Sequence, residues 1–208
     1  MPPLRPVSAV EALAAALRER ILSGEIVPGA PLPEQDLAAA YGVARPTVRE
    51  AIATLVHEGI LRRERNRSAY VPEVTAEDLA DLLYARRPLD HAVAAALSGR
   101  RVPEADAALD RIAALPAGAP WSEIVREHDL LHDALVAAVG SPRLVRLYAA
   151  LAAETRLGVA QLQASYPDRD VLVTQHRALL DGIASGDPDA VRQAVDAHIE
   201  LGWHDLLP

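Results

Sequence analysis

Residues 42–59 read GVARPTVREAIATLVHEG, and the architecture of this chain can be worked out from them. The first two residues form a short turn, and Pro46 stands where proline suits the first turn of a helix. The apolar residues that follow recur at helical spacing, which indicates one buried face. Gly59 ends the pattern, as glycine commonly does after a helix. The stretch therefore predicts a tight turn followed by a helix over residues 45–57.

Two arginines occupy the start of this helix. Arg45 and Arg49 are four residues apart, so they project from one face of its first turns. In helix-turn-helix proteins, the start of the second helix meets base edges in the major groove of DNA. We therefore expect a DNA-binding regulator whose remaining residues sense a signal.

The residues before this helix predict two more helices in a domain over residues 1–74. Ser8 and Glu11 have the spacing of a capping box, which starts a helix that stops at Gly24. Two prolines and a glycine in residues 26–32 favour an extended connector. A short second helix then opens at Pro33-Glu34 and ends at Tyr41-Gly42, with two residues expected to be buried: Leu37 and Ala38.

After Gly59 the pattern changes to that of a β-hairpin. Residues 60–63 and 69–71 are the expected strands, and a polar, arginine-containing turn over residues 64–68 joins them. Helix, helix, turn, helix and hairpin together make a winged helix-turn-helix. Arginines at the tip of such a wing reach phosphate or the minor groove, although most exposed arginines are only solvated surface charges.

Composition places the chain among globular proteins. It has 208 residues, half of them hydrophobic, with no Phe and no Cys. The core must therefore be aliphatic, and disulfides and thiolate metal sites are excluded. We found no apolar run long enough to span a bilayer and no signal peptide in the first residues. A cytoplasmic protein without a membrane partner is the simplest expectation.

The net charge of −8 is unevenly distributed. Up to Val74, nine Arg balance nine Asp or Glu, whereas from Thr75 onward twelve Arg face twenty acidic residues. The sequence contains no Lys, so every side-chain cation apart from histidine is a guanidinium, which is suited to bidentate contact with phosphate or guanine. Charge thus permits DNA binding by the first domain without requiring it.

Residues 8–72 resemble the DNA-binding domain of the GntR family of bacterial transcription regulators. The resemblance rests on ILSGEIVPGAPLPEQDLAAAYGVARPTVREAIATLVHEGIL and on RNRSAYV. It implies base and phosphate contacts from the recognition helix and the wing, and it places Gln35 where relatives often have a basic phosphate contact. The residues implied to contact DNA are Gln35, Arg45, Thr47, Arg49, Asn66, Arg67 and Ser68.

Two positions depart from that family pattern. Ala44 stands where the family usually has Ser or Thr, which removes a hydroxyl that could cap the helix or contact phosphate. Ser68 replaces the usual glycine of the wing, which restricts the backbone at the tip.

Residues 75–208 predict a second, all-α domain. Thr75 is the expected N-cap of a new helix and follows closely after Pro72. The linker between the domains is therefore short. Five or six helices follow, separated by glycine- or proline-containing breaks, and no strand pattern occurs. The expected architecture is an antiparallel helical bundle, with helices near 75–98, 103–114, 121–139, 141–164, 168–185 and 187–206.

Four histidines lie on or beside the inward faces of three of these helices: His128, His132, His176 and His198. A single histidine on an apolar stripe is usually an ordinary core residue. Four unpaired imidazoles in an aliphatic bundle would each cost desolvation energy, whereas one shared metal ion satisfies them all. Two of them are four residues apart on one helix, a spacing that suits binding of one ion.

The second domain resembles the ligand-binding FCD domain of the FadR-type branch of the GntR family. The matching segments are EHDLLHDALVAAVGSPRL, HRALLDGIASGDPDAVRQAVDAHI and YARRPLD. Many members of that branch bind a divalent metal through one Asp and three His, and sense small carboxylic acids that complete its coordination. His132, His176 and His198 match the three histidines, and His128 falls where the family has Asp.

An all-imidazole site is more positive than one with a carboxylate ligand. We therefore expect this site to attract an anionic effector more strongly than a site with a carboxylate ligand, and to prefer Zn²⁺ or Ni²⁺. Asp129 is an alternative ligand that could compensate. For Arg86, two interpretations stay open: it holds an effector carboxylate, as the resemblance weakly suggests, or it forms a structural ion pair with Asp90.

Together these features predict a homodimeric repressor that binds a palindromic operator in double-stranded DNA and is released by a small carboxylate effector. One alternative is the same regulator class with a metal-free pocket for an apolar acyl ligand. A metal-dependent enzyme built on the histidines is another, but no convincing general base accompanies them. We therefore expect no enzymatic activity.

Overall fold

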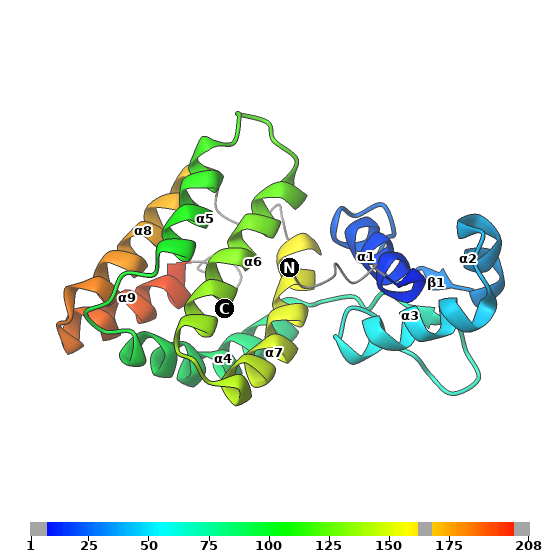
Figure 1. Ribbon diagram of the computed structural model, residues 1–208, viewed down its shortest axis with the longest axis horizontal. Coiled ribbons are helices and arrows are strands. Elements are labelled where there is room, and N and C mark those ends of the chain that lie inside the picture. Colours follow the sequence, from blue (N-terminus) through cyan, green and yellow to red (C-terminus); the bar gives the residue numbers. More distant parts are fainter. Residues whose placement is uncertain (1–7, 162–167, 202–208) are drawn as a thin grey trace, which may run out of the picture. The chain divides into compact units, whose positions relative to one another are not determined.

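The computed structural model describes residues 8–161 and 168–201. The chain divides into two compact units, Met1–Glu73 and Val74–Pro208. We call them the amino-terminal unit and the carboxy-terminal unit, and we describe each by itself. Figure 1 labels their elements. Over the described residues, no helix is both long enough and apolar enough to cross a bilayer.

The amino-terminal unit contains three helices and a small sheet: α1 (Ala9–Leu22), β1 (Pro31–Leu32), α2 (Glu34–Tyr41), α3 (Arg45–His57) and β2 (Ala69–Tyr70). The predicted capping box is confirmed, because the Glu11 N–H donates to Ser8 Oγ at 3.1 Å and the Ser8 N–H donates to the Glu11 carboxylate at 2.9 Å. Helix α1 packs on α3. The predicted inner face of α3 is also confirmed, since its apolar stripe is fully buried: Val48, Ile52 and Leu55.

The predicted wing hairpin is only partly correct. β2 pairs antiparallel with β1, which lies in the predicted connector, and residues 60–63 contribute a single bridge between Arg62 and Tyr70. The reason is that Ile60 and Leu61 are both buried. Consecutive residues of a regular strand point to opposite faces, so two adjacent buried side chains break the strand pattern.

The expected burial of Leu37 and Ala38 is wrong. Both residues are only half-buried, and α2 contains no buried residue. This helix has only eight residues, and its main packing partner is α3, so none of its side chains is fully enclosed.

The carboxy-terminal unit contains six helices over its described residues: α4 (Ala76–Ala96), α5 (Pro103–Ala114), α6 (Trp121–Ala138), α7 (Pro142–Gln161), α8 (Arg169–Ser185) and α9 (Pro188–Leu201). The expected extensions to residues 164 and 206, and the break at 165–167, lie outside the described residues. Short turns join α6 to α7 and α8 to α9, and both pairs pack together, as in an antiparallel bundle. The predicted fold class, mainly α with a winged helix-turn-helix and a helical bundle, is confirmed.

Two features of this unit position the site described below. Thr75 and Asp78 form a capping box at the start of α4, which confirms the predicted N-cap. Helices α8 and α9 come unusually close at Gly182, where an added Cβ atom would overlap the Cβ atom of Ala194. This contact lies between the α8–α9 connection and the turns that carry His176 and His198, so it holds the two helices close where those side chains meet.

Candidate metal centre and DNA-binding surface

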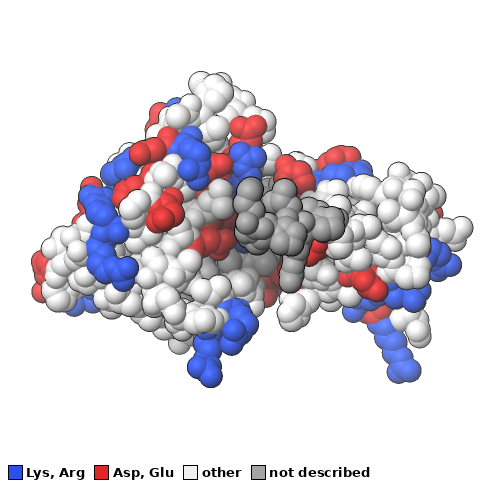
Figure 2. Space-filling model, viewed as in Figure 1, with Lys and Arg blue, Asp and Glu red and all other residues white. Residues whose placement is uncertain are grey.

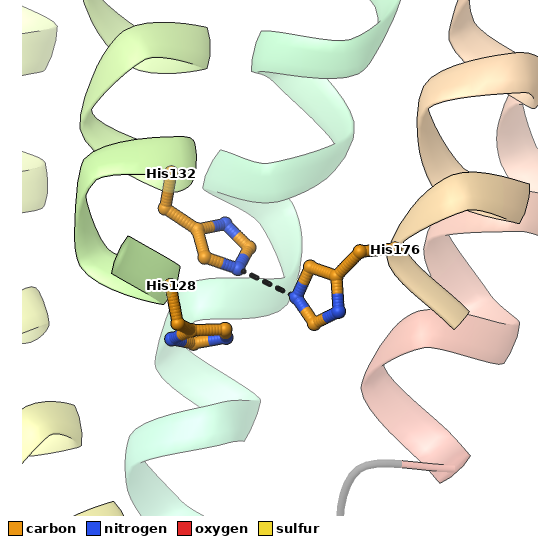
Figure 3. Close-up of side chains that lie close together, drawn as sticks. All are labelled: His128, His132 and His176. Atoms are coloured by element: carbon orange, nitrogen blue, oxygen red, sulfur yellow. Dashed lines mark hydrogen bonds between the residues drawn. The ribbon is translucent and has the colours of Figure 1, made fainter. Parts of the chain in front are cut away.

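The four predicted histidines meet inside the carboxy-terminal unit. His128 and His132 come from α6, His176 from α8 and His198 from α9. Their ring centroids lie 4.6 to 5.3 Å apart in each of five pairs. Figure 3 shows the first three rings turned toward one another between the helices. We call these four residues the histidine cluster.

The donor atoms of the cluster suit a metal ion. One ring nitrogen from each of His128, His132 and His176 lies within 4.8 Å of the others. The His176 Nδ1–H donates to the Leu172 carbonyl at 2.8 Å, which leaves the Nε2 lone pair facing His132 Nε2 at 3.3 Å. A metal-binding histidine commonly has its other ring nitrogen fixed by such a bond.

Burial keeps these imidazoles neutral. It lowers the pKa of His176 to about 4 and the pKa values of the other three well below the ordinary 6.5. Neighbouring imidazoles and the charge of Arg86 lower the pKa values of His128, His132 and His198 further. His198 is half-buried, but its Nδ1 atom is buried without a hydrogen-bond partner among the described residues. Neutral, partly unsatisfied imidazoles are the form that binds a divalent ion.

Asp129, the alternative ligand, has another partner. Its carboxylate lies 2.8 Å from Arg156 Nε of α7 and 3.9 Å from His128 Nδ1. Burial raises the pKa of Asp129 to about 7, against the opposing effect of Arg156. This ion pair directs the carboxylate toward α7, so the cluster itself consists of imidazoles.

Arg86 is buried beside the cluster and has several partners. Its guanidinium donates to Thr155 Oγ1 at 3.0 Å and to Tyr148 Oη at 2.6 Å, and it lies 3.6 Å from the Asp90 carboxylate. The structural ion pair considered from the sequence is therefore present. The same geometry leaves a buried positive charge next to the site. Tyr148, Thr155 and Arg156 were missed from the sequence, because all three belong to α7, whose pattern shows only an ordinary amphipathic helix.

Two small cavities adjoin the cluster. The apolar cavity, of about 20 Å³, is lined mainly by aliphatic side chains. The polar cavity, of about 10 Å³, is lined by Arg86, Asp129, Asp133 and Thr155, among others. His132 and Tyr148 line both cavities, so the two meet at these side chains.

The predicted DNA-contacting residues lie on the surface of the amino-terminal unit. Arg45 and Arg49 are exposed at the start of α3, Gln35 is exposed in the first turn of α2, and Thr47 is half-buried. Ala44 is the N-cap of α3 and provides no side-chain cap, as its departure from the family pattern implies. The wing tip contributes three exposed residues, of which Asn66 adopts a left-handed conformation (φ 63°): Asn66, Arg67 and Ser68.

Glu34 connects the recognition helix to the wing, a role that the sequence did not reveal. Its carboxylate accepts hydrogen bonds from Arg49 at 3.3 Å and from Arg63 at 2.5 Å. These bonds lower the pKa of Glu34. Only the position of Glu34 at the start of α2 could have signalled it, and acidic residues are common there.

Charge on the carboxy-terminal unit is mixed. On the face drawn in Figure 2, basic and acidic side chains alternate over this unit, so the excess of acidic residues does not form one continuous patch there.

Comparison with known families accounts for both units. Residues 9–71 match the family of bacterial regulatory proteins called gntR, and residues 73–201 match the FCD domain. The chain belongs to the GntR family. It is therefore a DNA-binding transcription regulator and not an enzyme, in agreement with the sequence resemblance.

Individual relatives of this GntR protein support the same class. It is 27% identical over 206 residues to an HTH-type transcriptional regulator in an unstable DNA locus of Streptomyces ambofaciens, covering 91% of this chain and 81% of the relative. It is 24% identical to the gluconate operon transcriptional repressor of Bacillus licheniformis, and the match covers 90% of this chain and 81% of that relative. The crystal structure of a GntR transcriptional regulator from Rhodococcus sp. RHA1 matches with a TM-score of 0.79 and 27% identity, covering 95% of this chain and 96% of the other.

Proposed function

We propose that this GntR regulator is a repressor that a small carboxylate releases from DNA, and that the carboxylate binds at a divalent metal held by the histidine cluster. The observation that carries the proposal is the meeting of four neutral imidazoles from three helices at one buried point. Of the metals available, Zn²⁺ and Ni²⁺ suit an all-nitrogen donor set best.

His128, His132, His176 and His198 would hold the ion. When bound, it supplies positive charge and a coordination position that a carboxylate oxygen can fill. The Leu172 carbonyl fixes the tautomer of His176, so that its Nε2 lone pair faces the cluster. Asp129 stays with Arg156 and does not compete for this position.

Arg86 serves as the second anchor for the carboxylate. Its buried guanidinium lines the polar cavity with His132, and Thr155, Tyr148 and Asp90 hold it in place. Held in this way, it can attract an anion without losing side-chain entropy on binding. The structural ion pair and the effector contact are therefore compatible roles of one residue.

On the DNA side, Arg45, Thr47 and Arg49 read base edges, and Gln35, Asn66, Arg67 and Ser68 contact the backbone or the minor groove. A two-fold homodimer would present two such surfaces to a palindromic operator. Helix α4 carries Arg86 and begins directly after the boundary between the units. An effector would act through its different affinity for the DNA-competent and DNA-incompetent forms.

Metal analysis of the purified full chain tests this proposal. We expect about one zinc or nickel ion per chain, and loss of most of it in His132→Ala and in His176→Ala. His57→Ala is the matched control, because His57 is an exposed histidine of α3, outside the cluster. If the wild-type chain takes up neither ion at neutral pH, the metal site is wrong, and the metal-free pocket for an apolar acyl ligand becomes the better account.

A further inference from the structure

We infer that Glu50 of the recognition helix reads a cytosine in the major groove of the operator. This inference rests on the DNA-binding surface of the proposed function and deepens it, because it names a base and the residue that selects it. It depends neither on the metal nor on the effector. The observations that carry it are the place of Glu50 on α3, the lack of an ion pair to its carboxylate over the described residues, and the small side chains beside it.

Glu50 lies on the outward ridge of α3. This ridge stands opposite the buried stripe of the helix and consists of exposed residues at helical spacing: Pro46, Glu50, Ala53 and His57. When a recognition helix lies in a major groove, its outward ridge meets the base edges and its flanks face the two phosphate walls. Arg45 and Thr47 lie on opposite flanks of this ridge. A negative charge at Glu50 is therefore directed at the bases and away from both rows of phosphates.

No cation of its own helix neutralises the Glu50 carboxylate. The positions three and four residues away along the helix carry no charge: Pro46, Thr47, Ala53 and Thr54. Arg49, the preceding residue, is held by Glu34 instead. Over the described residues, the ion pairs of the amino-terminal unit do not include Glu50. Its carboxylate is therefore available to accept a hydrogen bond from DNA.

The donors and acceptors of the major groove select cytosine for a carboxylate. Guanine presents two acceptors there, and thymine presents one acceptor and a methyl group, so neither base can donate a hydrogen bond to Glu50. Adenine presents an amino donor beside its N7 acceptor, and N7 repels the second carboxylate oxygen. Cytosine presents its N4 amino group with no acceptor beside it on the same base. Cytosine is therefore the base that a carboxylate on the ridge binds best.

The neighbours of Glu50 on the ridge leave this contact to it alone. Pro46 lies one turn before it and Ala53 one turn after it, and both side chains are short and apolar. Neither side chain can accept a hydrogen bond from a base, and their small size allows α3 to approach the base edges closely. Glu50 is therefore the one side chain among these three that can select a base by hydrogen bonding.

Selection of duplexes from a randomised pool by the purified full chain tests the inference. We expect the enriched half-site to contain a cytosine whose selection is lost in Glu50→Ala, while the other positions keep their preferences. In Glu50→Gln the same position should change to adenine, because a glutamine amide binds adenine N6 and N7 together. The two variants remove the same charge, so weaker repulsion of phosphate does not explain a difference between them. If the wild type and both variants enrich the same sequence, the inference is wrong.

A modified base tests the hydrogen bond itself. N4-methylcytosine carries a methyl group in place of the amino hydrogen that points into the groove, and it keeps the hydrogen that pairs with guanine. At the selected position it should weaken binding of the wild-type chain roughly tenfold or more and leave binding of Glu50→Ala unchanged. Equal weakening in both proteins would overturn the inference. Glu19→Gln is the matched control, because Glu19 is an exposed carboxylate of α1 in the same unit, and it should behave like the wild type.

Arg45→Ala separates the inference from the proposed DNA-binding surface. If this variant changes the enriched sequence and the two Glu50 variants do not, the recognition helix reads DNA without Glu50, and the inference alone fails. If none of the three variants changes the enriched sequence, the proposed surface fails together with the inference.

Discussion

Glu34 places a negative charge inside the proposed DNA-binding surface. Its carboxylate holds Arg49 of the recognition helix and Arg63 of the wing, and Glu34 is itself largely buried, with 13% of its side chain exposed. Such a charge weakens contact with any phosphate backbone, and it also restricts Arg49 to few conformations. We interpret Glu34 as a residue that lowers non-specific binding more than specific binding.

Replacing Glu34 by Gln tests this interpretation. The variant should bind random-sequence duplex more tightly and with a steeper salt dependence, because two guanidinium groups become available for phosphate. The slope of log K against log salt should change by about one to two units. Anisotropy titrations with a random duplex and with a duplex enriched from a randomised pool give both quantities. Arg49→Ala is the comparison variant. Its binding free energy should weaken by about 1–3 kcal/mol for the enriched duplex and not for the random one. An unchanged salt slope in Glu34→Gln would contradict the interpretation.

The histidine cluster could be predicted from single residues, whereas its surroundings could not. Four histidines at helical spacing on apolar faces give a testable pattern, and the cost of burying unpaired imidazoles made a common meeting point the best interpretation. The partners of Arg86 and Asp129 come from α7. No local pattern shows which helices of a bundle become neighbours, so these contacts required the structure.

The approach of α8 to α9 at Gly182 leads to a prediction about helix packing. Gly182→Ala should destabilise the protein by about 1–3 kcal/mol, because the new Cβ atom meets Ala194 Cβ and α9 has to shift. This cost exceeds the gain of about 1 kcal/mol from replacing a helical glycine by alanine. Zinc affinity should fall as well, since His176 and His198 move apart. Urea unfolding and zinc titration measure the two effects.

The double variant Gly182→Ala/Ala194→Gly provides the control, because it removes the atom with which the new Cβ collides. It should recover zinc affinity while losing some helix stability at Ala194. Gly158→Ala is a second control in α7, where the Cβ would lie 3.1 Å from a methyl group of Leu79 and would disturb the packing away from α8 and α9. If Gly182→Ala binds zinc like the wild type, close packing at this point does not position the cluster.

Helices were easier to predict than the sheet. Capping boxes at Ser8 and Thr75 are local in sequence, so their helices begin where expected. The sheet instead joins residues 31–32 to residues 69–70, far apart in the chain. Its pairing depends on the burial of Ile60 and Leu61, which is a property of the packed unit.

The carboxy-terminal unit as a whole should lose stability in mild acid when no metal is bound. Burial holds the pKa of His176 at about 4, against about 6.5 in the unfolded chain, and lowers the pKa of the other three histidines of the cluster as well. Between these pH values the unfolded chain binds protons that the folded chain does not, so the free energy of unfolding falls as pH falls. His176 alone accounts for about 2 kcal/mol between pH 6.5 and 5.

Asp129 and Asp90 act in the opposite direction, because burial raises their pKa values and favours the folded form as pH falls. Asp129 offsets much of the effect of His176, but the three other imidazoles act in the same direction as His176, so a net loss of stability is expected between pH 6.5 and 5. Chelator-treated protein unfolded in urea at several pH values measures it. Asp129→Asn should make the loss steeper. Constant stability over this range would mean that the rings are hydrated in the metal-free protein.

The shielding of the site has a consequence for the speed of the response. His176 is 1% exposed and Arg86 is 6% exposed, so a ligand meets neither group at the surface of the closed fold. Entry must wait until helices separate transiently, a motion of microseconds to seconds. In rapid mixing, the observed association rate should therefore level off at high ligand concentration. The delay between the arrival of a metabolite and the change in transcription would then be a property of the bundle, independent of how abundant the metabolite becomes.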